Sequence, residues 1–538
     1  MSDHQPAKRE RLVRCRLVIL VAAAVIAGLD RPVVADRPER PNLVVILFDD
    51  LGFSDLGCYG GEMDTPALDR LAADGLRMTR FYNTGRCAPS RAALLTGRYA
   101  HEVGLGWLTN DFGHPGYQDQ IDPSVPLVSE RLSEAGYRCY GVGKWHLCKI
   151  NPETAEGPRE NWPLRRGFQR YFGTIYGTGS YFRPPTLVQD DQLVAADSLT
   201  DDFYYTDAIG RRASEFVEQH VESDSDMPFF LYMAQFAPHA PLHARPEDIA
   251  IYRGRYDQGP EPIIKARLRQ QVTMGIVPRQ NAFASLDPDL PPWDSLNEAQ
   301  QRHLSQKMEI YAAQVHRADR SVGRLVETLR RTNQLDHTVV IVLSDNGGAS
   351  SGGAFGTPRG GAETSLDSKQ SRHAIGRLWS RVSNTPFRLY KSFVHEGGIA
   401  SPLIIHWPSG LRSHGIDRNN VGHVIDITPT LCDLAGIDRA DASWRGRSLR
   451  PVMQGKRLPD RQLHFEHQGN RAWIDGDWKI VWRGKDGPWE LYRLSNDRNE
   501  KHDLAVQYPE RVQQMAEQWH RRAERYQVLD YFPAPWAD

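Results

Sequence analysis

This chain has few cysteines and no surplus of charge of either sign. Its 538 residues include six cysteines, too few for a scaffold held together by many disulfide bonds, and no His and Cys cluster has the spacing of a zinc site. Lys and Arg total 66 against 67 Asp and Glu, so we expect no nucleic-acid partner. Internal repeats and low-complexity tracts are also lacking. The length exceeds that of one compact core and favours a large domain with a smaller one.

Long hydrophobic runs are rare, and the most extended one lies near the N-terminus. The apolar residues Leu17 to Leu29 follow a basic segment and precede the small residues Val33-Val34-Ala35. Because this run is short for a membrane span, it predicts a signal peptide over residues 1–35, with an uncleaved anchor as the alternative. We therefore expect export to the periplasm or the extracellular space, and no stable membrane insertion after cleavage. The sequence leaves the pairing of the remaining cysteines open: Cys58, Cys87, Cys139, Cys148 and Cys432.

Short apolar segments followed by polar residues predict an α/β fold. The run Leu43 to Phe48 is unbroken, as expected for a strand buried on both faces of a parallel sheet, and a helix with Thr65 as N-cap follows it. The same pattern recurs at 139–143, 229–236 and 339–343. Ligands of open α/β sheets bind beyond the carboxyl ends of the strands, so the polar residues that follow these strands should line one crevice. They are Asp49-Asp50, Lys144-Trp145-His146, Pro238-His239 and Asp345-Asn346.

A change in composition near residue 440 predicts a catalytic domain over 36–440 and a small C-terminal subdomain over 441–538. The second part has strand-like segments separated by Asp475-Gly476 and Asp486-Gly487 turn signals, followed by an amphipathic segment from Pro509 to Tyr526. We expect a small antiparallel sheet with one helix packed on it. Residues 244–298 and 347–384 lack a sustained apolar period and are predicted to be long loops near the crevice.

The segment Cys87-Ala88-Pro89-Ser90-Arg91 predicts an anion site with a reactive atom. Pro89 suits the first turn of a helix, and Gly97 is a suitable stop for it. Cys87 then lies at the helix entrance, where free N–H groups and the helix dipole favour an oxyanion and a thiolate, and Arg91 adds a positive charge one turn on. Taken alone, the segment is also compatible with an inert buried thiol.

The acidic and amide residues after two of the predicted strands are candidate metal ligands. Asp49, Asp50, Asp345 and Asn346 offer the hard oxygen atoms that Ca²⁺ or Mg²⁺ prefers. A single Asp-Asp pair is weak support, because acidic residues often cap helices and turns. Two such groups after two buried strands are a stronger indication.

The motifs together resemble the sulfatase family, and most of all bacterial arylsulfatases. Residues 87–91 match the signature Cys-x-Pro-Ser-Arg, and the match continues through Leu94-Leu95-Thr96-Gly97. Arg86, before the cysteine, is less usual in the family than a small or apolar residue. The resemblance spans essentially the whole chain after residue 35 and implies the alkaline-phosphatase-like sulfatase fold: a large mixed, mostly parallel sheet flanked by helices. The other matching segments are Asp49-Asp50, Gly143 to His146, Pro238-His239, Asp345 to Gly347, Lys391, Glu396 to Ile399 and Trp489 to Tyr492.

The resemblance implies hydrolysis of sulfate esters by a modified cysteine. In the family this residue is converted to formylglycine (3-oxoalanine), so a formylglycine-generating enzyme is an expected partner, and the hydrated aldehyde attacks sulfur. One Ca²⁺ polarises the sulfate of a sulfated small molecule or glycan. The implied calcium ligands are Asp49, Asp50, Asp345, Asn346 and residue 87. The implied catalytic residues are Cys87, Arg91, Lys144, His146, His239 and Lys391, with His239 and Lys391 assisting the leaving group and His146 accepting a proton.

Two other functions remain open from the sequence. A phosphate or phosphonate monoester hydrolase of the same fold would use the same metal and anion site, although Cys87 at the nucleophile position favours sulfate. A catalytically silent binder of sulfated glycans would keep Cys87 unmodified, and the full set of acids, cations and histidines argues against it.

Overall fold

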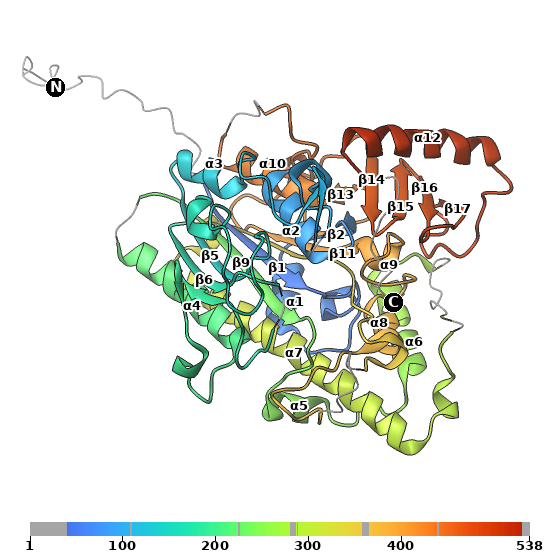
Figure 1. Cartoon of the computed structure of the whole chain (residues 1–538), viewed down its shortest axis with the longest axis horizontal. Helices are drawn as coiled ribbons and strands as arrows, with labels where there is room; N and C mark the ends of the chain where they lie inside the picture. Colours follow the sequence, from blue (N-terminus) through green and yellow to red (C-terminus); the bar gives the residue numbers. More distant parts are fainter. Residues whose placement is uncertain are drawn as a thin grey trace, which may run out of the picture. The chain divides into compact units, whose positions relative to one another are not determined.

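The computed structural model describes residues 40–107, 110–177, 179–223, 226–279, 287, 289–357, 365–437 and 441–529 (Figure 1). The predicted signal peptide and the predicted domain boundary at residue 440 both lie outside these residues. Within them, no helix is both long and apolar enough to cross a membrane.

A large mixed sheet forms the centre of the fold. In the described part of the chain it has 11 strands, and the order along the path is β12-β2-β11-β10-β1-β9-β5-β6-β7-β8, with β13 paired to β2. The central strands β10, β1, β9, β5 and β6 are parallel, whereas β11 runs antiparallel to β10 and β2. The bounds are β1 (Asn42–Asp49), β2 (Leu76–Tyr82), β5 (Arg138–Lys144), β6 (Arg170–Thr174), β7 (Leu187–Gln189), β8 (Gln192–Leu193), β9 (Phe229–Pro238), β10 (Thr338–Ser344), β11 (Ala400–His406), β12 (Gly415–Asp417) and β13 (Gly422–His423).

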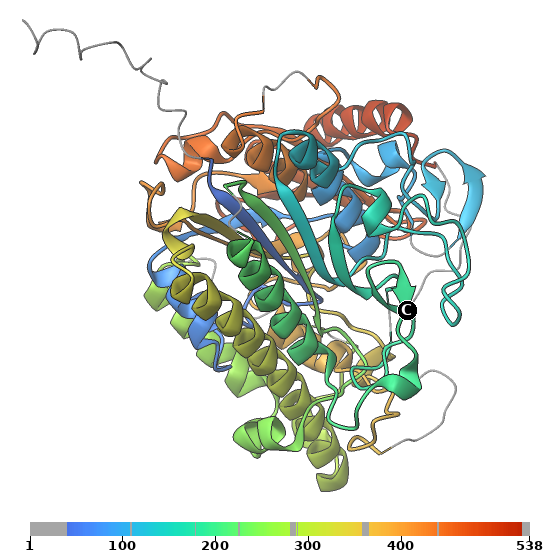
Figure 2. The same cartoon turned by 90° about the vertical axis from the view of Figure 1, so that its left-hand side faces the viewer.

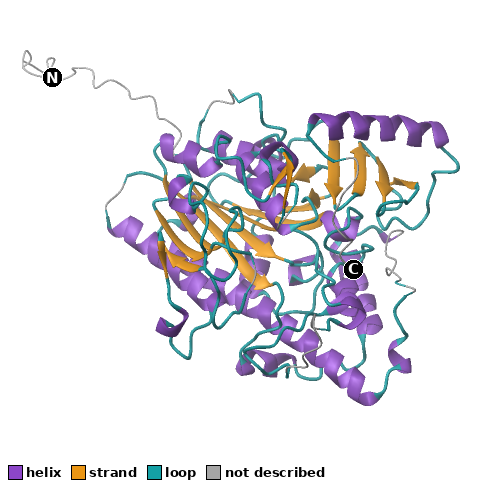
Figure 3. Cartoon of the chain, in the orientation of Figure 1, coloured by secondary structure: helices purple, strands orange, loops and turns teal. Residues whose placement is uncertain are grey.

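Both faces of this sheet are buried, as the apolar run of β1 predicts. Successive residues of β1 point to opposite faces, so Val44 and Ile46 pack in one hydrophobic cluster and Leu43 and Val45 in another. Figure 3 shows the strands lying between helices, and Figure 2 shows α4 and α7 side by side on one face. The cluster around Val44 includes residues of α1 (Pro66–Ala73), α4 (Tyr205–Glu222), α5 (Pro246–Tyr252), α6 (Pro260–Met274), α7 (Glu298–Arg331) and α8 (Gly376–Ser383). The cluster around Leu43 includes residues of α2 (Cys87–Thr96), α3 (Val128–Glu134), α10 (Ile427–Leu434), α11 (Arg450–Met453) and α12 (Pro509–Arg525).

The predicted small antiparallel sheet and its helix are present near the C-terminus. Its four strands lie in the sheet in the order in which they occur in the sequence, and α12 packs on them. Trp473, Leu491 and Trp519 belong to the same hydrophobic cluster as Leu94 of α2, so this sheet shares a core with the large one. The bounds are β14 (Gln462–His467), β15 (Asn470–Asp475), β16 (Trp478–Trp482) and β17 (Trp489–Arg493), and a separate hairpin has β3 (Asp111–His114) and β4 (Tyr117–Gln118).

A buried ion-pair network also joins the small sheet to the rest of the chain. Lys479 of β16 lies 3.0 Å from Glu396 of α9 (Glu396–Ile399) and 2.7 Å from Glu500, and none of the three side chains is exposed. Glu396 also pairs with Arg498 at 2.7 Å. Because α9 lies five residues after Lys391, this network fixes a segment that leads into the crevice.

Two local predictions were wrong, and a third was confirmed only in part. Residues 244–298 and 347–384 are not simply loops, because they contain α5, α6 and α8 and the start of α7. Thr65 is the N-cap residue of α1, as predicted, but its side chain makes no capping hydrogen bond. The carboxylate of Asp319 in α7 instead accepts hydrogen bonds from the N–H groups of Ala67 and Leu68, at 3.1 and 2.8 Å. A helix N-terminus needs an acceptor, and here a residue distant in sequence provides it.

The five cysteines of the described residues are free and buried. Cys58, Cys139, Cys148 and Cys432 form no disulfide with one another or with Cys87. Burial raises the pKa of Cys432 to about 12, so this thiol is protonated at neutral pH. The fold therefore rests on packing and ion pairs.

Candidate active site

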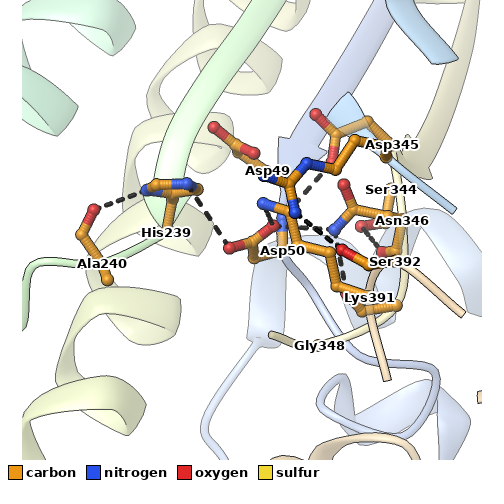
Figure 4. A network of polar contacts seen from close by, with 12 residues as sticks. Asp49, Asp50, His239, Ala240, Ser344, Asp345, Asn346, Gly348, Lys391 and Ser392 are labelled. Carbon is orange, nitrogen blue, oxygen red and sulfur yellow. Dashed lines mark hydrogen bonds and ion pairs between the residues drawn. The ribbon is translucent and has the colours of Figure 1, made fainter. Parts of the chain in front are cut away.

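Two neighbouring parallel strands bring polar side chains to one edge of the large sheet. β1 ends at Asp49 and is followed by Asp50, and β10 is followed by Asp345 and Asn346. The Asn346 amide donates to Asp50 Oδ1 over 2.7 Å, and the Asp50 N–H lies 3.4 Å from Asp345 Oδ1. Asp50 has a φ of 68°, in the left-handed region, at the point where the chain leaves the strand. The structure thus gathers the four residues that the sequence singled out (Figure 4).

Two buried cations pair with these carboxylates from other elements. Arg91 of α2 donates from Nε and Nη2 to Asp345 Oδ2 over 3.0 and 2.7 Å, and from Nη1 to the Lys144 carbonyl over 2.9 Å. Lys144, the last residue of β5, donates to Asp49 Oδ2 over 2.6 Å. None of these four side chains is exposed. The helix that begins at Cys87 is therefore tied to the ends of three strands.

Lys391 is the third cation of the site and pairs with Asp50. Its own backbone N–H donates to the Gly348 carbonyl over 3.2 Å. Burial favours the neutral form of each group, but the opposite charges dominate, so the pKa of Asp50 is lowered and that of Lys391 is raised. The pKa of Asp49 is lowered in the same way, against burial, chiefly by Lys144. These groups are charged at neutral pH.

Cys87 is the first residue of α2 and is 2% exposed. Burial alone would raise the pKa of its thiol, but the charges of Lys144 and Lys391 dominate and lower it below the ordinary value. The helix ends at Gly97, whose φ is 71° and whose N–H donates to Ala93, as the sequence predicts. The thiol thus occupies an electropositive position at a helix entrance, where thiolates and oxyanions are stabilised.

His239 faces Asp50 from the end of β9. Its Nδ1 is hydrogen bonded to the Ala240 carbonyl, which requires a proton on Nδ1 and directs Nε2 into the site, 3.6 Å from Asp50 Oδ2. Figure 4 shows His239 on one side of Asp50 and Asn346 with Lys391 on the other. Burial lowers the pKa of His239, although Asp50 opposes this. The imidazole has one nitrogen fixed by the backbone and one available for chemistry.

His146 lies two residues after β5, with a φ of 63°. Its ring is buried, and Nδ1 has no hydrogen-bond partner among the described residues. Burial and the charge of Lys144 lower its pKa well below the ordinary value, so the ring is neutral at pH 7. Gly177 packs on the ring so closely that a Cβ there would lie 2.1 Å from His146 Cε1. This contact, which no sequence signal indicates, fixes the ring orientation.

The site contains buried oxygen atoms that fit a hard cation. Asp49 Oδ1 and Asn346 Oδ1 have no hydrogen-bond partner among the described residues, although buried oxygens are nearly always paired. Ligand atoms of Asp49, Asp50 and His239 lie within 4.8 Å of one another. Asp345 uses Oδ2 for Arg91, so Oδ1 is the atom it offers, and burial together with the charge of Asp49 raises its pKa. This donor set suits Ca²⁺ or Mg²⁺.

Sequence reasoning named every residue of this cluster, but it did not predict the pairing of each cation with a particular carboxylate. Lys391 and Asp50 are 341 positions apart, and only the packed fold brings them together. It also missed the place of His239 beside Asp49 and Asp50 in a possible metal-binding group.

Comparison with known families identifies matches over nearly all the described chain. The model described as "Sulfatase" matches residues 41–437, and the one described as "N-sulphoglucosamine sulphohydrolase, C-terminal" matches residues 387–528. The second match covers the small antiparallel sheet and all of α12.

Individual proteins are similar over comparable lengths. The chain is 32% identical over 528 residues to an uncharacterized sulfatase of Schizosaccharomyces pombe, covering 89% of this chain and 93% of that protein. It is 32% identical over 441 residues to an arylsulfatase of Klebsiella aerogenes, covering 78% and 91%. The crystal structure of Ps i-CgsB in complex with k-i-k-neocarrahexaose matches with a TM-score of 0.67 at 25% identity, covering 92% of this chain and 95% of that one.

Proposed function

Since this chain belongs to the sulfatase family and is a sulfuric ester hydrolase, we propose that it is an enzyme of arylsulfatase type with a nucleophile made from Cys87 and one Ca²⁺ as cofactor. The single observation that carries the proposal is the arrangement around Cys87. The thiol lies at the entrance of α2 within the electrostatic influence of Lys144 and Lys391, and Arg91 follows it by one helical turn. Such an arrangement stabilises a nucleophilic oxygen or sulfur anion beside a tetrahedral oxyanion.

The residues present fit a calcium ion. Asp49, Asp50, Asp345 and Asn346 would hold it, and the unpartnered oxygens of Asp49 and Asn346 support this assignment. Residue 87 would contribute an oxygen ligand once it is converted to formylglycine, since a thiolate is a poor ligand for so hard a cation. When bound, Ca²⁺ would polarise the S–O bonds of the sulfate group.

The protein's own side chains would bind the sulfate and move the protons. Arg91, Lys144 and Lys391 are buried cations that oppose negative charge on the sulfate oxygens. Residue 87, as the hydrated aldehyde, would supply the oxygen that attacks sulfur. His239 Nε2 points into the site because Nδ1 is held by Ala240, so it is placed to assist the leaving alcohol together with Lys391.

His146 is placed to accept a proton during the release of sulfate. Its pKa is depressed by burial and by Lys144, so the ring is neutral and able to act as a base at pH 7. The packing of Gly177 on the ring restricts its orientation. A neutral, immobilised imidazole supports this role for His146.

We propose a sulfated small molecule or a sulfated glycan as the substrate. The Klebsiella relative is named an arylsulfatase, and the Ps i-CgsB structure contains k-i-k-neocarrahexaose. The proposal includes maturation by a formylglycine-generating enzyme and export to the periplasm or the extracellular space, with residues 1–35 as signal peptide and residues 441–538 as a C-terminal subdomain.

The first test compares turnover of an aryl sulfate with that of the matching aryl phosphate, using protein co-expressed with a formylglycine-generating enzyme. A large preference for sulfate is expected. A preference for phosphate would favour a phosphate or phosphonate hydrolase, and no turnover of either would favour a silent glycan binder.

A cysteine variant tests the nucleophile. Cys87→Ala should abolish turnover, whereas Cys432→Ala, which removes another buried thiol, should retain it. Equal melting temperatures of the Cys87→Ala and wild-type proteins would show that the fold is intact. Turnover by Cys87→Ala at the wild-type rate would refute the assignment.

A further inference from the structure

Arg86 differs from the other cations of the site in having no carboxylate partner. Arg91, Lys144 and Lys391 each pair with an aspartate, whereas Arg86 forms no ion pair with any described residue. Its Nη1 donates to the uncharged Ser392 hydroxyl over 2.7 Å, and its Nε is buried with no partner among the described residues. The side chain is half-buried, so part of the guanidinium is accessible. A partly desolvated positive charge without an anion is costly unless a ligand supplies one.

Arg86 lies at the entrance of the reaction site. It is the N-cap residue of α2 and immediately precedes Cys87, the first residue of that helix. Its hydrogen-bond partner Ser392 follows Lys391, a residue proposed to assist the leaving group. The Arg86 guanidinium is therefore close to the nucleophile, residue 87, and to Lys391, which is proposed to assist the leaving group.

Hydrogen bonds hold the segment that positions Arg86. The Ser392 carbonyl accepts a hydrogen bond over 3.1 Å from Nδ2 of Asn470, the first residue of β15, directly after the turn between β14 and β15. That turn is held by Glu466, whose Oε1 accepts from the Gly469 N–H over 2.7 Å and whose Oε2 lies 2.7 Å from His101 Nε2. A guanidinium held in this way loses little entropy when it binds an anion.

We propose that Arg86 is a specificity-determining residue that binds a second anionic group, a carboxylate or a second sulfate, on the alcohol part of the substrate. This inference rests on the proposed function. The planar guanidinium presents paired N–H donors that match the oxygens of either group, and the sulfate to be cleaved already has the three buried cations. A doubly anionic aryl or sugar sulfate would therefore be preferred to one that carries only the reacting sulfate.

The alternative is that Arg86 only tethers Ser392. Three variants separate the two roles. Arg86→Met removes the charge at similar length, Arg86→Lys keeps the charge but not the paired donors, and Ser392→Ala removes the tether and keeps the guanidinium. The tether role predicts similar effects of Arg86→Met and Ser392→Ala.

The measurement is a ratio of kcat/KM values on one enzyme preparation. The reference is a nitrophenyl sulfate without other charges. The comparison substrates carry a ring carboxylate or a ring sulfonate, which presents the oxygens of a second sulfate but is not cleaved. Because both values in a ratio share the same active enzyme, incomplete conversion of residue 87 cancels, even if a change at Arg86 affects conversion.

We expect Arg86→Met to lower the ratio for at least one anionic substrate by about ten- to a hundredfold, the usual effect of losing hydrogen bonds to a charged group. Arg86→Lys should give an intermediate ratio, and Ser392→Ala should change it by less than about threefold, as expected for a neutral contact. The comparison substrate whose kcat/KM ratio falls in Arg86→Met identifies the anionic group that Arg86 binds. An unchanged ratio in Arg86→Met, or an equal loss in Ser392→Ala, would overturn the inference. Failure of the wild-type enzyme to cleave any of the aryl sulfates would instead refute the proposed function.

Discussion

Replacing Lys479 with Met should destabilise the whole described fold. Lys479 pairs with Glu396 and Glu500, and none of these three side chains is exposed, so the substitution leaves Glu500 buried without this cation and Glu396 with Arg498 alone. Removal of one partner of a buried pair costs about 3–5 kcal/mol. Residues 41–538 form one compact unit, for which an unfolding entropy of about 2 cal/mol/K per residue gives roughly 1 kcal/mol/K. The expected fall in Tm is therefore about 3–5 °C.

The assay is thermal unfolding followed by calorimetry, with Lys456→Met as the control because Lys456 is an exposed lysine in the same part of the chain. The control should change Tm by less than about 1 °C, since exposed substitutions rarely exceed 0.5 kcal/mol. If residues 441–538 unfolded separately, the same loss would fall on far fewer residues and shift their transition by roughly 15–25 °C. An unchanged Tm, or a separate early transition, would refute the reasoning that one shared core and a buried ion-pair network stabilise both sheets.

Three further results are expected. Gly177→Ala should reduce kcat by at least about tenfold with little change in Tm, because its Cβ displaces the His146 ring; an undiminished kcat would contradict a catalytic role for that ring. Chelation of calcium should lower turnover and Tm together, because a ligand present at 100 times its Kd stabilises by about 2.7 kcal/mol, and unchanged values of both would contradict the metal site. Burial raises the pKa of Glu490, but His395 and other neighbours lower it to about 2, so its stabilising effect is complete above the unfolded value and is lost as the pH falls toward 2. The Tm difference between wild type and Glu490→Gln should therefore be larger at pH 7 than at pH 3, and a difference that grows on acidification would reverse the sign of this argument.

Hydrophobic patterning revealed those elements whose buried faces are apolar. The strands β1, β5, β9 and β10 and the small C-terminal sheet were predicted from apolar runs and turn signals. Helix α6 was missed because part of its buried face is polar. Arg267 is buried and donates hydrogen bonds to Asp55 and Glu62, and the buried Gln271 donates to the Thr385 carbonyl over 2.9 Å. The helix therefore has no apolar period in its sequence.

The composition of the candidate site was more predictable than its internal contacts. The carboxyl ends of parallel strands share one edge, so residues after β1 and β10 had to meet there. No such rule links Arg91 to Asp345 or Lys391 to Asp50, because α2 and the segment before α9 reach the edge only through tertiary packing. The contact of Arg86 with Ser392 likewise depends on tertiary packing, and the sequence did not predict it.

The burial of Cys87 restricts the time at which this residue can be modified. With 2% of the residue exposed and its helix packed against α3 and α10, no enzyme can reach the thiol in the finished fold. If residue 87 is converted to an aldehyde, conversion has to occur while this segment is still extended, during synthesis or transport. Under that proposal, a chain that folds before modification would keep its thiol, and the active fraction of a preparation would depend on the relative rates of folding and modification.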